Sequence, residues 1–261
     1  MSFISTLLPL LLGPILARLP FSALALKLFL HDYLPLLLLF CCWALAARNV
    51  QSLAGMPIEP DSGRMRRRLK SLLLVLTAFI LLLSLQALRQ GISLEGFYLA
   101  LALLGAGALG MLAAQKGWIA ARIGLGFLYS SGLGVLSLFV GTGEWRWQAV
   151  LAGASLACML QTVEIARLLS SGQVAPNGSR LLARMYQIMA YLGPALMAGL
   201  PVFNELQQSY LLVLLVLPFS LPLATRFSSI GEAAQLPENT ARESAGVSLL
   251  FMLMLLIARI L

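Results

Sequence analysis

The sequence predicts an all-α integral membrane bundle of about nine transmembrane helices, in a single domain covering residues 1–261. The chain is 60% hydrophobic and only 11% charged, and its mean hydropathy is +0.91. A soluble domain is typically ~45–50% apolar and ~25% charged, so the excess of apolar side chains must face lipid. This composition excludes a soluble enzyme, a disordered chain and a disulfide scaffold.

The predicted spans are uncharged runs bounded by charges or by Gly, Pro and polar clusters. An α-helix needs ~17–25 apolar residues to cross the hydrocarbon core, and open sheet edges cannot be satisfied in lipid. The first positive residue is Arg18, so the first run lacks the basic region with which a signal peptide begins and is expected to be a mature span. The predicted helices lie near 2–17, 26–47, 71–88, 95–115, 119–141, 147–169, 182–203, 206–225 and 244–261.

Basic residues divide unequally between the two sets of loops that nine alternating spans create. One set holds the N-terminus and loops 48–70, 116–118, 170–181 and 226–243. Together with Arg122, Arg167 and Arg184 in the adjoining ends of the spans, this set takes 13 of the 18 Lys and Arg residues. By the positive-inside rule this set is cytoplasmic. We therefore expect an inner or plasma membrane protein with its N-terminus and loop 48–70 inside and its C-terminus outside. The net charge of +8 then reports topology, and no nucleic-acid partner is expected.

Few residues suggest a metal or nucleotide site. The three cysteines include the adjacent Cys41 and Cys42, which fit neither a disulfide framework nor C-x-x-C metal spacing. His31 is the one histidine, so no metal site with a pair of histidines can form within the chain. There is no P-loop and no dinucleotide fingerprint. Glycines within the spans suit close approach of helices; they include Gly105, Gly107, Gly110, Gly124, Gly126, Gly132 and Gly134.

Four short motifs follow one another along the chain: LLPLLLG at 7–13, SGRM at 62–65, GLG at 124–126 with VGTG at 140–143 and Trp147, and ARMY at 183–186. In order and spacing they resemble the UbiA-type intramembrane prenyltransferases, especially the dihydroxynaphthoate prenyltransferase branch. This resemblance implies a nine-helix bundle whose cavity opens toward lipid and holds a long isoprenoid chain.

The same comparison reveals two departures from the family. Its members carry aspartate-rich motifs after the second and sixth helices, whose carboxylates hold magnesium ions on the substrate diphosphate. In the first motif Asn49 stands in the place of an aspartate, and no carboxylate follows until Glu59. In the second, Glu164 matches the first acid, but Leu168 stands where the second should be. Neither metal motif is complete.

Two functions remain open. The favoured one is a non-catalytic or altered homologue that needs no cofactor and binds an isoprenoid, quinone-like or other lipid, or acts as a membrane subunit beside another membrane protein. The alternative is an active enzyme that transfers a prenyl group from a prenyl diphosphate to an aromatic acceptor at a reduced Mg site. Loops 48–70 and 170–181 are expected to border the cavity on the cytoplasmic side.

The candidate site residues follow from both functions. Glu164 is explained equally by an ion pair with Arg167, one helical turn away, or as a relict of the substrate site. The candidate substrate-binding residues are Asn49, Arg64, Lys70, Glu164, Arg167, Arg180 and Arg184, and the candidate metal ligands of the alternative are Glu59, Asp61 and Glu164.

Overall fold

The computed structural model describes residues 8–11, 31, 33–54, 62–170, 176–203, 207–228 and 239–261. These residues contain helices and no strand, which confirms the all-α prediction for this part of the chain. The helices are α3 (Leu34–Ala54), α4 (Ser62–Gly91), α5 (Leu94–Gln115), α6 (Ile119–Thr142), α7 (Trp147–Ser170), α8 (Pro176–Val202), η2 (Gln208–Val216), α9 (Leu217–Ser228) and α10 (Thr240–Ile260).

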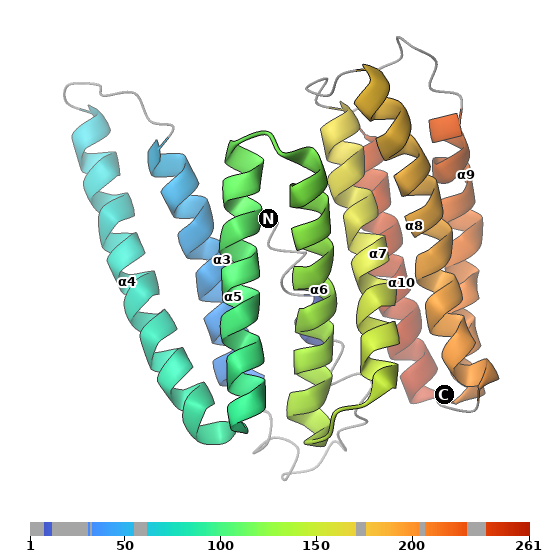
Figure 1. The fold of residues 1–261 in the computed structure, drawn as a ribbon, viewed down its shortest axis with the longest axis horizontal. Helices are drawn as coiled ribbons and strands as arrows, with labels where there is room; N and C mark the ends of the chain where they lie inside the picture. The colour runs from blue at the N-terminus through green and yellow to red at the C-terminus, as the bar shows by residue number, and fades with distance from the viewer. Residues whose placement is uncertain are drawn as a thin grey trace.

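The helices stand side by side and alternate in direction (Figure 1). α3 packs on α4, α5 on α6, α6 on α7 and α7 on α8, while α10 packs on α7 and on η2. The 3-10 helix η2 continues directly into α9, and the two together make one crossing. The short connections between consecutive helices explain why neighbours in the sequence are mostly neighbours in space.

Six helices in the described part of the chain are long and apolar enough to cross a membrane, as expected of an integral membrane protein. α8 is also long, but its glutamine, tyrosines and prolines lower its hydropathy. α3 contributes a shorter apolar stretch, Leu34–Val50. The predicted run 2–17 lies outside the described residues except for 8–11, which are helical. The count of nine spans stays a prediction. The six spans are Leu69–Gly91, Leu94–Gln115, Ile119–Thr142, Trp147–Ser170, Gln208–Arg226 and Thr240–Ile260.

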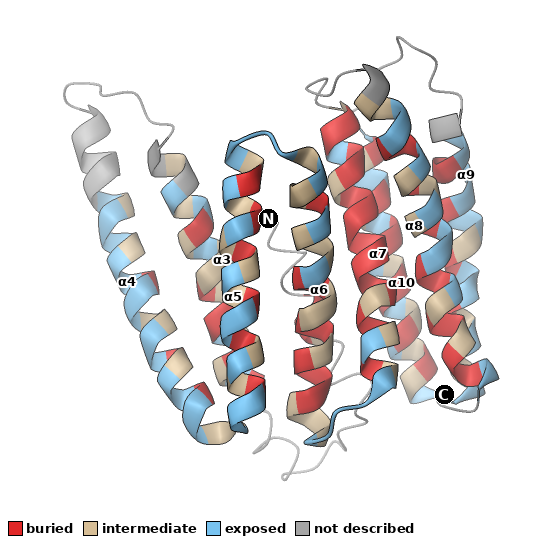
Figure 2. Cartoon of the chain, in the orientation of Figure 1, coloured by how far each residue is buried: buried red, intermediate tan, exposed pale blue. Residues whose placement is uncertain are grey.

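Burial is concentrated around α7. In its most apolar stretch 78% of the residues are buried within the protein, compared with 17% in α4, and Figure 2 shows the same contrast between the two helices. A helix that is apolar all round belongs in a protein core or in lipid. α7 is the core helix of the bundle, whereas most of the apolar surface of α4 is left for the bilayer.

The positions of the helix ends agree with the predicted division of loops. The C-terminal ends of α3, α5, α7 and α9 lie at the same end of the bundle as the N-terminal ends of α4, α6, α8 and α10 (Figure 1). This end carries most of the described basic residues, and Arg89, Arg146 and Arg259 lie toward the other end. That the basic end is cytoplasmic remains a prediction from the positive-inside rule.

Candidate functional site

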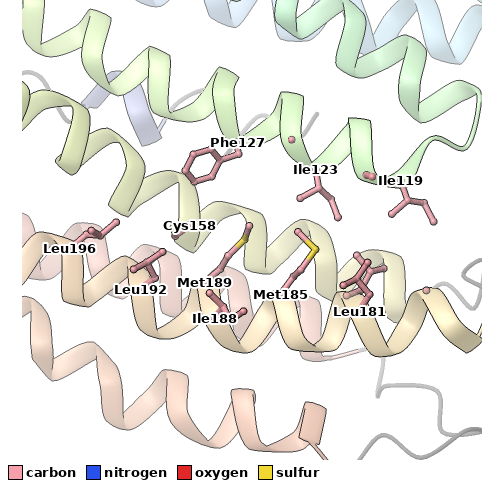
Figure 3. Close-up of a pocket in the computed structure, with 14 residues that line it drawn as sticks. Ile119, Ile123, Phe127, Cys158, Leu181, Met185, Ile188, Met189, Leu192 and Leu196 are labelled. Carbon is pink, nitrogen blue, oxygen red and sulfur yellow. The ribbon is translucent and has the colours of Figure 1, made fainter.

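A cavity of about 520 Å³ lies over α7, between α6 and α8 (Figure 3). Its volume is within the ~300–1,000 Å³ typical of ligand pockets. The side chains that line it are apolar apart from one thiol. They include Ile119, Ile123 and Phe127 from α6, Cys158 from α7, and Leu181, Met185, Ile188, Met189, Leu192 and Leu196 from α8.

Close contacts with α7 set the positions of the two walls. The Ser155 hydroxyl on α7 donates a hydrogen bond to the Gly193 carbonyl oxygen of α8, 2.5 Å away. On the other side, the Gly153 backbone of α7 lies so close to the Ser131 carbonyl of α6 that a Cβ would be 2.5 Å from its oxygen. α6 and α8 each pack on α7 but are not among the helix pairs that pack extensively on each other. The space over Cys158 is therefore left open.

The cavity is a groove along the lipid-facing surface. Leu181 and Ile188 line it and are each 61% exposed. Its lining on α8 extends from Gly178 to Leu196, which at a helical rise of 1.5 Å per residue is ~27 Å. This length approaches the ~30 Å thickness of the hydrocarbon core. The groove is an apolar channel that is open toward lipid and nearly as long as the hydrocarbon core is thick.

An interhelical ion pair lies beside the groove. Arg122, on α6 next to the lining residue Ile123, donates to the Glu164 carboxylate on α7. The pair is partly shielded, with side-chain exposures of 32% and 19%. A carboxylate in a membrane helix is costly unless it is paired, so this pair accounts for Glu164. Its partner differs from the predicted Arg167, which is exposed one turn farther along α7.

Two other predicted residues meet between α3 and α4. The Lys70 ammonium donates to the Ser52 hydroxyl at 3.0 Å, and that hydroxyl donates to the Asn49 carbonyl oxygen at 3.0 Å. The side-chain Nδ2 of Asn49 is buried without a hydrogen-bond partner in the described part of the chain. Asn49 and Lys70 therefore belong to a small polar cluster that connects the two helices.

The remaining candidate site residues lie in different parts of the chain. Arg180 and Arg184 are exposed near the start of α8, on either side of the lining residue Leu181 in the sequence. Arg64 lies at the start of α4, and nothing is described of its side chain; Glu59 and Asp61 lie outside the described residues. Among the described residues there is no group of three or more His, Cys, Asp and Glu side chains that could hold a metal.

The described candidates form two groups rather than one site. One group is at the ends of α3 and α4, and the other is on α7 and α8; α5 and α6 lie between them (Figure 1). The groove is lined by residues of α6, α7 and α8, and its Gly178 and Leu181 come from the predicted loop 170–181. None of the described lining residues comes from loop 48–70, so a cavity bordered by both loops stays a prediction. No pattern in the sequence singled out the groove residues. The i, i+4 pair Met185 and Met189 was visible, but such a pair is equally typical of a packed core.

Comparison with known proteins gives no relative: no protein-family model matches the chain, and no curated protein matches it significantly in sequence. The UbiA-type resemblance is thus supported by short motifs alone.

Proposed function

We propose that this integral membrane protein binds the hydrocarbon chain of a membrane lipid in the groove between α6, α7 and α8, and does not transfer prenyl groups. The single observation that carries the proposal is the apolar, lipid-facing groove, ~27 Å long at the helical rise of 1.5 Å per residue. The UbiA-type resemblance favours an isoprenoid or quinone-like lipid as the ligand. It also favours a membrane subunit role, in which the bound lipid is presented to a membrane protein partner.

The environment of Glu164 supports binding rather than catalysis. Magnesium prefers several hard oxygen ligands in near-octahedral geometry. Glu164 is the described acid that best matches the family's motifs, and its carboxylate is already neutralised by Arg122. Binding a metal there would require this ion pair to break, so the prenyltransferase with a reduced magnesium site is the less favoured function.

Two glycines allow the groove to be tested with matched variants. A Cβ at Gly124, which lines the groove, or at Gly105, on the surface of α5, would meet no atom within 4 Å. Gly124→Phe should fill the groove, whereas Gly105→Phe places the same ring outside it. Native mass spectrometry of protein extracted from its membrane should show a bound lipid in the wild type and Gly105→Phe, and loss of it in Gly124→Phe.

Two results would overturn the proposal. Equal lipid retention in both glycine variants would show that the groove is not the binding site. Magnesium-dependent diphosphate release from labelled prenyl diphosphates, abolished in Glu164→Gln, would establish the enzyme instead.

A further inference from the structure

We infer that the groove sets the length of the lipid that it binds: it holds a single hydrocarbon chain of about 18–22 carbons, which enters between Ile119 and Leu181 and ends at Leu196. We call the first two residues the open end of the groove and Leu196 its closed end. The inference rests on the proposed function and adds the number of chains, their direction and their length.

The open end of the groove lies where two helices begin. Ile119 is the first residue of α6, and the lining on α8 begins at Gly178, close to the start of that helix. Figure 3 shows Ile119 and Leu181 toward one end of the row of lining side chains, with Leu196 at the other. Since α6 and α8 both begin at the end of the bundle that carries most of the described basic residues (Figure 1), a chain can enter the groove from that membrane surface.

At the closed end, the α8 wall joins the core around α7. The last α8 residue of the lining is Leu196, and three residues before it the Gly193 carbonyl oxygen accepts the hydrogen bond from Ser155 of α7. One turn beyond Leu196, Leu200 is fully buried and belongs to the core cluster that includes Leu156 of α7. The apolar row of α8 therefore continues into packed protein.

The α6 wall ends in the same way. Phe127 is the last α6 residue of the lining and lies at about the level of Cys158 along the helix axes (Figure 3). One turn farther along α6, the Ser131 carbonyl oxygen would be 2.5 Å from a Cβ at Gly153 of α7. Leu138, two turns later, is buried in the same core cluster as Leu200. Both walls thus lead into the core, and the groove is closed at this end.

The width of the groove fits one hydrocarbon chain. The cavity has a volume of about 520 Å³. Divided by a length of ~27 Å, obtained from the helical rise of 1.5 Å per residue, this volume gives a mean cross-section of ~19 Å². A chain whose carbons approach their neighbours to ~3.5–4.0 Å takes ~12–16 Å². Two chains side by side need twice that area, so the second tail of a two-chain lipid stays in the bilayer.

The depth of the groove limits the length of the chain. Leu196 lies ~22 Å along the helix axis from Leu181 and ~27 Å from Gly178. An extended chain with C–C bonds of ~1.52 Å and tetrahedral angles advances ~1.25 Å per carbon, so about 18–22 carbons reach the closed end. Each carbon up to that length gains contacts with the lining, and further carbons gain none. The hydrocarbon core is ~30 Å thick, so such a chain passes the middle of the bilayer.

The test is a series of lysophosphatidylcholines, which share one headgroup and carry a single saturated chain of about 12 to about 24 carbons. Each is offered to the wild-type protein in mixed micelles with an equal amount of the shortest member, and native mass spectrometry reports the ratio retained. We expect one lipid per protein. If each added methylene gains one carbon contact, the ratio should rise about fivefold by about 20 carbons and stay level beyond about 22.

Leu196→Trp should shorten the preferred chain. The lining then ends at Leu192, four residues and ~6 Å earlier, so the ratio should become level at about 13–17 carbons. Retention of the shortest member should stay as in the wild type, which shows that the variant is folded. Ala195→Trp is the matched control, because Ala195 is the exposed neighbour of Leu196 and does not line the groove; it should keep the wild-type dependence on chain length.

Several outcomes would overturn the inference. If the wild type retains all chain lengths equally while Gly124→Phe retains none, the groove binds lipid but does not measure it, and the proposed function stands alone. Two lysolipids per protein, both lost in Gly124→Phe, would contradict the single chain. An unchanged length dependence in Leu196→Trp, or an equal change in Ala195→Trp, would contradict the closed end. If the wild type retains no lipid of any kind, the proposed function fails as well.

Discussion

Substituting Gly153 by alanine should separate α6 from α7. The added Cβ would be 2.5 Å from the Ser131 carbonyl oxygen, whereas the closest favourable C···O contacts are ~3.3–3.6 Å. The methyl group is therefore ~0.8 Å too close to an atom that belongs to a helix backbone and cannot rotate away. Overpacking of this kind typically costs about 1–3 kcal/mol.

Thermal unfolding in detergent measures this cost. A loss of about 1–3 kcal/mol corresponds to a fall in Tm of about 3–10 °C for a chain of this size. Gly199→Ala is the matched control, since a Cβ there would meet no atom within 4 Å. A Tm for Gly153→Ala equal to that of the control would refute the close contact and, with it, the account of how the groove is held open.

Two further predictions concern the ion pair and the topology. In a double-mutant cycle with Arg122→Gln and Glu164→Gln, the coupling free energy of unfolding should be about 1–2 kcal/mol, above the ~0–1 kcal/mol of exposed pairs and below the ~3–5 kcal/mol lost on breaking buried ones; a coupling of zero would contradict the partial shielding of the pair. A compartment-sensitive reporter inserted after Lys116 should give a cytoplasmic signal and one after Glu144 an external signal, and the reverse result would contradict the positive-inside prediction.

Hydropathy predicted the central helices closely because polar turns mark their ends. The predicted runs 95–115, 119–141 and 147–169 match α5, α6 and α7 to within a residue or two. The predicted run 26–47 ended too early, because Arg48 bounds the apolar run whereas α3 continues through polar residues to Ala54. Residues 26–30 and 32 of the run lie outside the described residues.

The site was harder to predict because it depends on which helices are neighbours. Arg122 and Glu164 are 42 residues apart, and a pattern within one helix leads to Arg167 instead. The glycines illustrate the same difficulty. Gly126 is covered by the side chain of Gln161, as expected of a close contact, whereas Gly124, two residues away, borders open space. Spacing alone does not distinguish a helix face that packs from one that lines a groove.

The groove and the core are both consequences of α7. Its residues Gly153 and Ser155 make the close contacts with α6 and α8 on nearly opposite faces, since two residues turn a helix by ~200°. It also supplies Glu164 for the ion pair with Arg122. α6 and α8 are thereby fixed to different faces of the same helix, and neither can move over Cys158 without losing a contact to α7. Protein interiors are close-packed, so the helices resist such a movement. The space that the groove occupies is thus maintained by the bundle itself, so a lipid that enters it meets walls already in position and needs no large rearrangement to bind.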